Sequence, residues 1–230
     1  MNKNMNIAAA VIALGVPGLA SVAGAGTITA KYTSNLGQSA NITASGGIYD
    51  GSVNTVAFHW TRTDTAGAGV DSTVPITFDT YCVDLEQNVR ANTNFTFQVI
   101  SMADAGYSAL QRTLLTQLWA ASKASIDTKE ESAAFQLAVW EIVYDTNLNT
   151  SNGSFKVNSS STLRNAAQAL VTNASNLASN PAAANFELVV LRSDNAQDQI
   201  TAIPVPSPGT AALAGFGALL ACPRRKKAAK

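Results

Sequence analysis

The spacing of the apolar residues changes twice along the chain, and this limits the fold more than any other feature. Between residues 27 and 102, apolar and polar residues mostly alternate, as in strands with one buried face. Between 108 and 178 the apolar residues recur three or four positions apart, as in amphipathic helices, and residues 186–192 again have the composition of a strand. This order predicts one α+β domain, an antiparallel β-sandwich or barrel-like sheet with an inserted bundle of about three helices.

Local composition places the individual elements. Strands are expected at 27–33 with a continuation at 42–44, and at 53–63, 74–85, 93–102 and 186–192. Helices are expected at 108–123, 128–145 and 161–178. Ser108 with Gln111, and Asp127 with Glu130, match the capping-box pattern at the start of the first two helices. The third helix has leucines seven residues apart, which predicts one apolar face.

The N-terminal residues 1–25 have the features of a secretory signal peptide. Lys3 supplies the positive charge, residues 7–19 are mainly apolar, and small residues precede a cleavage position after Ala25, with cleavage after Ala23 as the alternative. Glycine and proline inside the apolar run disfavour the alternative of a buried helix. We therefore expect an exported protein.

The C-terminal residues 203–230 form a proline-rich spacer, an apolar stretch at 209–222 and a final Arg/Lys cluster. This order resembles the PEP-CTERM sorting signal, although Ser207 stands where that family usually has Glu and Cys222 is followed by proline. The resemblance implies a sorting protease of exosortase type and transient anchoring in the inner membrane through 209–222. The stretch is short for a bilayer span, which needs about 20 residues, and a plain C-terminal anchor is the alternative.

The charges are unevenly distributed, although the formal net charge is zero. The expected domain, residues 26–202, contains nine Lys and Arg residues and all fifteen Asp and Glu residues. A net acidic domain argues against a nucleic-acid partner, because phosphate contacts need a basic surface. One histidine, His59, and one cysteine in this range argue against a metal site, and no glycine-rich phosphate loop indicates a nucleotide cofactor.

The cysteine in this range, Cys82, has no disulfide partner there, because the only other cysteine is Cys222 in the C-terminal segment. Its thiol could pair between molecules, stay buried and inert, act as a nucleophile, or be used in another covalent bond. A Cys-His hydrolase would need His59 as the base, but no cysteine-protease signature surrounds Cys82. His59 is expected to be an ordinary residue of an alternating strand.

Gln136 is the unusual residue of the predicted helix 128–145, because its neighbours are almost all apolar. A buried carboxamide without partners costs roughly 1–3 kcal/mol, so it either caps a backbone group or belongs to a site. Trp140 follows four positions later and lies about 40° away around the helix, over the same face. Gln117 with Trp119 is a similar pair on another helix, but a spacing of two residues turns the tryptophan about 200° away.

Two short segments resemble the motifs of the thioester domains of bacterial surface proteins. Tyr81-Cys82-Val83 matches an aromatic-Cys segment on a strand, and residues 135–140 match a hydrophobic-Gln-x-x-hydrophobic-Trp segment on a helix. The resemblance covers about residues 75–190. It implies a thioester cross-link between Cys82 and Gln136, and Tyr81, Asp84, Trp140 and Glu141 are the candidate residues of the supporting pocket.

The function implied by this resemblance is covalent adhesion. The Gln136 acyl group would transfer to an amine or hydroxyl of a partner, a surface protein or a polysaccharide, and release the thiol of Cys82. Such an acyl transfer happens once per molecule, so the protein would not be an enzyme, and it needs no cofactor. The alternative is a non-reactive structural protein of the extracellular matrix, in which Cys82 is a buried thiol.

Overall fold

The computed structural model describes residues 26–205, and its longest strand, β1, organises the sheet. The strands are β1 (Thr27–Ala44), β2 (Tyr49–Arg62), β3 (Thr77–Cys82), β4 (Asn94–Ser101), β5 (Phe155–Val157), β6 (Phe186–Arg192) and β7 (Gln199–Pro204). The beginning of β1 pairs with β4, most of its length pairs with β2, and its end pairs with β5. The remaining neighbours run β2-β3-β7-β6-β4, so the strands other than β5 form a closed antiparallel ring. The predicted barrel-like sheet is confirmed.

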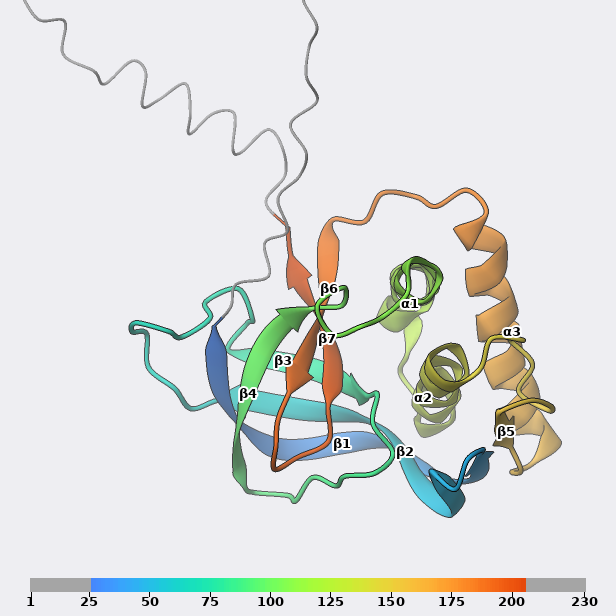
Figure 1. The fold of residues 1–230 in the computed structure, drawn as a ribbon. Helices are drawn as coiled ribbons and strands as arrows, with labels where there is room; N and C mark the ends of the chain where they lie inside the picture. The colour runs from blue at the N-terminus through green and yellow to red at the C-terminus, as the bar shows by residue number, and fades with distance from the viewer. Residues whose placement is uncertain (1–25, 206–230) are drawn as a thin grey trace, which may run out of the picture.

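The helices lie together on one side of the barrel (Figure 1). They are α1 (Ala109–Ser122), α2 (Lys129–Tyr144) and α3 (Ser161–Ala178), with a short 3-10 turn, η1 (Lys123–Ser125), after α1. Helix α2 contacts strands β1, β2 and β3, and both α1 and α3 pack on α2. The sequence therefore predicted correctly that the α2 segment is buried, and the structure explains this by its position between the barrel and α3.

A buried serine fixes α2 to the sheet. The hydroxyl of Ser132 accepts a hydrogen bond from the Ala57 N–H (3.0 Å) and donates one to the Leu36 carbonyl oxygen (2.6 Å). Those two backbone groups lie on β2 and β1, which pair at this point. One side chain thus sets where the helix sits along the β1–β2 ladder.

The apolar core has two clusters, and the first of them extends from the barrel interior to α2 and α3 through Leu137, Trp140 and Leu163. The barrel interior is built around Trp60 and Phe97, whose rings meet edge to face with centroids 5.3 Å apart. The second cluster lies between the sheet and the helices, where Tyr81 of β3 packs on Phe135 of α2 with ring centroids 4.5 Å apart. Because neighbouring residues of a strand face opposite sides, Tyr81 belongs to this second cluster, whereas Cys82 belongs to the first, which also contains Trp140 of α2.

Several details of the prediction need correction. The capping box of α1, Ser108 with Gln111, is confirmed, but the box of α2 uses Thr128 with Glu131, one residue later than predicted. Strand β1 is continuous through residues 34–41, where the sequence indicated a gap. Of the three leucines spaced seven residues apart in helix α3, Leu163 is buried, Leu170 is half-buried and Leu177 is exposed. The buried residues of this helix are Leu163, Ala167, Val171 and Ala174.

Strand β7 was missed, because it is short and ends at a proline. Its pairing with β6 runs from Leu191–Gln199 to Phe186–Pro204, and it also pairs with the end of β3. The predicted domain boundary after residue 202 therefore falls inside this strand. Proline is tolerated there, since it occupies the last position of the strand.

The predicted signal peptide (1–25) lies outside the described residues, and so does most of the predicted C-terminal segment, including Ser207, the apolar stretch 209–222 and Cys222. Within residues 26–205, none of the helices has the length and apolar character that a membrane span requires.

Candidate functional site

The structure brings Cys82 and Gln136 into direct contact. Cys82 is the last residue of β3, and Gln136 lies in the middle of α2, where both are buried. The Cys82 N–H donates to Gln136 Oε1 (2.9 Å), and Gln136 Nε2 donates to the Cys82 carbonyl oxygen (2.8 Å). Both polar atoms of the Gln136 carboxamide are thus hydrogen-bonded to the backbone of one residue, Cys82. The amide carbon is therefore held beside the residue that carries the sulfur.

The Cys82 sulfur itself is buried. Its S–H donates to the backbone carbonyl oxygen of Asp84. Burial raises the pKa of the Cys82 thiol far above its ordinary value; the hydrogen bond to Asp84 opposes this rise, while the carboxylates of Asp84 and Asp198 add to it. The thiol is therefore protonated at neutral pH.

Trp140 contributes an unused donor next to this sulfur. It lies one turn after Gln136 and is fully buried, and its indole N–H has no hydrogen-bond partner among the described residues. The N–H is nevertheless near enough to Cys82 to counteract part of the rise in the thiol pKa. A buried donor without a partner costs roughly 1–3 kcal/mol, and the Cys82 sulfur is the group near it.

A chain of buried polar groups supports the site from the barrel side, and the sequence did not reveal it. Gln197 Nε2 donates to the same Asp84 carbonyl oxygen that accepts the thiol proton (3.0 Å). Gln199 Nε2 donates to the Gln197 carbonyl oxygen, and Gln199 Oε1 accepts from the Thr80 hydroxyl (2.8 Å). Trp60 Nε1 completes the chain by donating to Thr80 (2.9 Å). The sequence did not indicate these roles because Gln199 lies in strand β7, which was not predicted, and Gln197 lies two residues before it.

Tyr144 holds the segment that follows Cys82. Its hydroxyl accepts from the Leu85 N–H and donates to the Val83 carbonyl oxygen, both at 3.2 Å. Burial raises the pKa of this hydroxyl, and its hydrogen bond with Leu85 opposes the rise. The loop over the sulfur is therefore attached to α2 at one point and to Gln197 at another.

The remaining predicted pocket residues, Asp84, Tyr81 and Glu141, do not lie together around the Cys82–Gln136 contact. Asp84 takes part through its backbone, and its carboxylate accepts from the Glu86 N–H (2.7 Å). Tyr81 faces the helices and packs β3 on α2. Glu141 is buried, but it lies about 140° around the helix from Gln136, near Asp145. Of the predicted set, Asp84 and Trp140 adjoin the Cys82–Gln136 contact.

His59 belongs to a separate cluster on the outer side of the sheet. Its Nδ1 is hydrogen-bonded to Asp79, which also accepts from Lys123 Nζ (2.9 Å). Burial alone would raise the pKa of Asp79, but the hydrogen bonds from Lys123 and His59 outweigh it and lower that pKa. Asp79 and Cys82 lie on opposite faces of β3, so this arrangement does not provide a base for the thiol.

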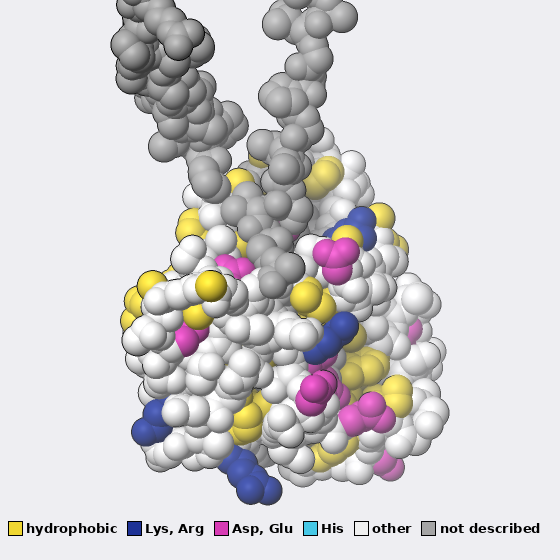
Figure 2. Space-filling model, turned by 60° about the vertical axis from the view of Figure 1, so that its left-hand side comes forward, with side chains coloured by type: hydrophobic (Ala, Val, Ile, Leu, Met, Phe, Trp, Pro, Cys, Tyr) yellow, Lys and Arg dark blue, Asp and Glu magenta, His cyan; other side chains and the backbone are white. Residues whose placement is uncertain are grey.

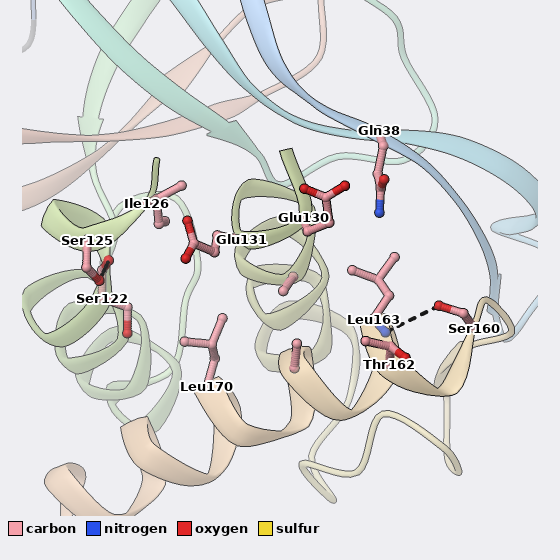
Figure 3. Close-up of a pocket in the computed structure, with 12 residues that line it drawn as sticks. Gln38, Ser122, Ser125, Ile126, Glu130, Glu131, Ser160, Thr162, Leu163 and Leu170 are labelled. Atoms are coloured by element: carbon pink, nitrogen blue, oxygen red, sulfur yellow. Dashed lines mark hydrogen bonds between the residues drawn. The ribbon is translucent and has the colours of Figure 1, made fainter. Parts of the chain in front are cut away.

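A cavity of about 360 Å³ lies on the other side of α2, between the beginnings of α2 and α3 and strand β1 (Figure 3). Leu163 and Leu170 of α3 point into it, and Ala134 contributes from α2. Ala134 is two residues before Gln136, about 200° around the helix. Neither Cys82 nor Gln136 lines this cavity.

Among residues 26–205 there is no cluster of three or more His, Cys, Asp or Glu side chains that could hold a metal ion. Charged side chains are sparse on the face shown in Figure 2, where most of the surface is neutral. The fold and site thus define an α+β protein with a paired, buried Cys and Gln.

Comparisons with known proteins add little to this geometry. No family model and no curated protein matches the chain. A solved structure described as "The N-terminal domain of the Streptococcus pyogenes pilus tip adhesin Cpa" is similar with a TM-score of 0.38 and 15% identity, over 81% of this chain and 97% of that chain. A similarity at this level establishes neither family nor function.

Proposed function

We propose that the protein forms an internal thioester between Cys82 and Gln136 and uses it once to attach covalently to another surface. The observation that carries this proposal is the double hydrogen bond between the Gln136 carboxamide and the Cys82 backbone (2.9 and 2.8 Å). It holds the acyl carbon beside the nucleophile without any separate catalytic centre, so proximity replaces a bimolecular encounter.

The bond-forming step follows from these contacts. The Cys82 sulfur attacks the amide carbon of Gln136, the carbon–nitrogen bond breaks, and the nitrogen leaves as ammonia with the thiol proton. Negative charge develops on Gln136 Oε1 during the attack, and the Cys82 N–H already points at that oxygen. Because burial raises the pKa of the thiol, the proton leaves the sulfur only as the new bond forms.

The reverse step captures the partner. An amine or hydroxyl attacks the Gln136 acyl carbon, the carbon–sulfur bond breaks, and the nucleophile's proton passes to the Cys82 sulfur. The unpaired indole N–H of Trp140 is suited to stabilise the sulfur while it carries negative charge. Burial of the site protects the thioester from water until a partner approaches.

The biological role that fits this chemistry is adhesion by an exported protein. The sequence features of residues 1–25 and 203–230 support export, transient membrane anchoring and processing by a sorting protease. The partner would be a surface protein or polysaccharide that offers the nucleophile. Each molecule reacts once, so the protein would not be an enzyme.

A second candidate function is a non-reactive structural protein, and one observation favours it. The Cys82 thiol has its pKa raised by burial and donates to the Asp84 carbonyl oxygen, as an inert buried thiol does. In this alternative, Gln136 serves to satisfy the buried backbone N–H and carbonyl groups of Cys82 at the end of β3.

The mass of the purified protein separates the two candidates. Thioester formation lowers the mass by about 17 Da through loss of ammonia and protects Cys82 from alkylation. We expect Gln136→Ala to abolish this deficit and the covalent capture of methylamine.

Gln117→Ala is the matched control, because Gln117 is also a buried glutamine of an apolar helix but donates to the Ala182 carbonyl oxygen. This variant should keep both the deficit and the capture. A full mass with a freely alkylated Cys82 in the folded wild type would favour the structural protein.

A further inference from the structure

A polar cleft of about 510 Å³ opens beside the loop that follows Cys82. One wall is the β1–β2 hairpin, which contributes Tyr32, Tyr49 and Phe58, and the other wall is formed by the loop 85–89 and Gln197. Its volume is in the range of about 300–1,000 Å³ that small-molecule sites occupy. The proposed reaction does not by itself account for this cleft.

Two residues belong to both the cleft and the Cys82 site. Gln197 lines the cleft and donates to the Asp84 carbonyl oxygen, which accepts the Cys82 S–H. Leu85 lines the cleft, lies in the same core cluster as Cys82, and is held through its N–H by Tyr144. Cys82 and Gln136 are buried and do not line the cleft, so a bound molecule would rest against the segment that covers the sulfur, and this segment has to move before the acyl carbon is reached.

The side chains of the cleft are chemically specific. Aromatic rings lie next to three amides, of which Asn35 donates to the Tyr32 hydroxyl, Asn54 accepts from the Ser39 hydroxyl, and Asn88 makes no such bond. Glu86 is the one charged residue among the described residues that line the cleft. The side chains of Glu86 and Asn88 are exposed and make no hydrogen bond to another described residue, so they are free to bind a ligand. Without a basic residue, the cleft does not suit an acidic polymer.

We infer that this cleft binds a neutral carbohydrate and presents one of its hydroxyl groups to the Cys82–Gln136 site. Sugar hydroxyls both donate and accept hydrogen bonds, as amide side chains do, and the Glu86 carboxylate accepts from them. The apolar face of a sugar ring packs on aromatic rings such as Tyr49. The cleft offers both kinds of contact in one place.

The covalent part of this inference rests on the proposed function. A sugar hydroxyl attacks the Gln136 acyl carbon of the thioester, a carbon–oxygen bond forms and the carbon–sulfur bond breaks. The hydroxyl proton passes to the Cys82 sulfur, and the product is an ester between Gln136 and the carbohydrate. The reversible binding part does not need the thioester.

The test separates these parts by using the full chain with Cys82→Ala, which cannot form a thioester. Binding of a neutral glucan hexasaccharide, an N-acetylated oligosaccharide of the same length, and Nα-acetyl-lysine amide is measured by saturation-transfer NMR and calorimetry. We expect one of the neutral oligosaccharides to bind with a dissociation constant of about 1 mM or below. Adding Glu86→Gln and Asn88→Ala together should weaken it at least about tenfold.

Asn173→Ala is the matched control, since Asn173 is an exposed asparagine of α3 outside the cleft, and it should leave binding unchanged. No saturable binding of either oligosaccharide, or binding that the loop variants do not affect, would overturn the inference. Binding of the lysine probe alone, lost in Glu86→Gln, would overturn it in favour of a protein partner. Methylamine capture by the wild type without sugar binding would support the proposed function and overturn the carbohydrate inference. Sugar binding by a protein without a mass deficit would support carbohydrate binding in the cleft and overturn the proposed function.

Discussion

Replacing Glu141 by glutamine should make the stability of this protein less dependent on pH. The Glu141 side chain is fully buried in α2, and neither carboxylate oxygen has a hydrogen-bond partner among the described residues. Burial, followed by the nearby carboxylate of Asp145, raises the pKa of Glu141 from 4.5 to about 7. The nearby backbone N–H of Asn149 lowers the pKa of Glu141 in part, but this N–H donates its hydrogen bond to Asn147 Oδ1.

The expected effect follows from the size and sign of this shift. One pKa unit corresponds to about 1.4 kcal/mol, so a rise from 4.5 to about 7 amounts to about 3 kcal/mol. Below the unfolded pKa, Glu141 is protonated in both states and the folded protein pays no ionisation cost. As the pH rises through the folded pKa of about 7, this stability is lost, because the unfolded chain ionises first.

Urea unfolding at about pH 4 and about pH 8.5 measures this directly. The free energy of unfolding of Glu141→Gln, relative to wild type, should increase by about 3 kcal/mol between the two conditions. Any cost of burying the glutamine amide is the same at both pH values, and other titrating groups cancel in the comparison. Glu130→Gln is the control, because Glu130 is an exposed acid at the start of the same helix. A difference between Glu141→Gln and wild type that does not change with pH would refute the reasoning.

Three further predictions concern single contacts. Trp140→Phe keeps an aromatic, though smaller, side chain and removes the unpaired N–H beside the sulfur, so opening of the thioester by methylamine should slow about tenfold or more. Trp119→Phe makes the same substitution away from the sulfur and should react as wild type. Equal rates would contradict the role given to the indole. Ser132→Ala removes the partner of the buried Ala57 N–H and of the part-buried Leu36 carbonyl, and should lower the free energy of unfolding by roughly 1–3 kcal/mol in urea titrations. Gly153→Ala should destabilise by about 2 kcal/mol or more, because its Cβ would lie 2.0 Å from Asp145 Oδ2; an unchanged denaturation midpoint would show that the loop rearranges freely.

The sequence predicted what depends on local pattern. The Ser108 capping box, the buried α2 segment and the contact between Cys82 and Gln136 could be inferred from spacing or resemblance, and the structure contains all of them. Whether the thioester forms stays a prediction. The second capping box was misplaced by one residue, because Asp127 and Thr128 are both good caps with a glutamate three residues later.

What could not be predicted depends on pairing between distant segments. Strand β7 has few residues and ends at a proline, and only its partners β3 and β6 make it a strand. The supporting roles of Gln197 and Gln199 follow from that strand, so they were missed with it. The position of Tyr81 on the face opposite Cys82 follows from the alternation of strand neighbours, whereas the motif resemblance groups Tyr81 with the pocket residues.

The location of the Cys82–Gln136 contact has a mechanical consequence. One residue lies on the barrel and the other on the helix layer, 54 positions apart along the chain. A bond between them would be a cross-link that closes a loop of this length, which is worth about 4 kcal/mol in the chain-entropy description. In the proposed reaction, capture of a partner would break that bond, so the attached domain would be less resistant to unfolding than the unreacted one. Under tension, an adhesin of this kind would first lose the packing of α2 against the barrel, while the ester or amide bond at Gln136 continued to hold the partner.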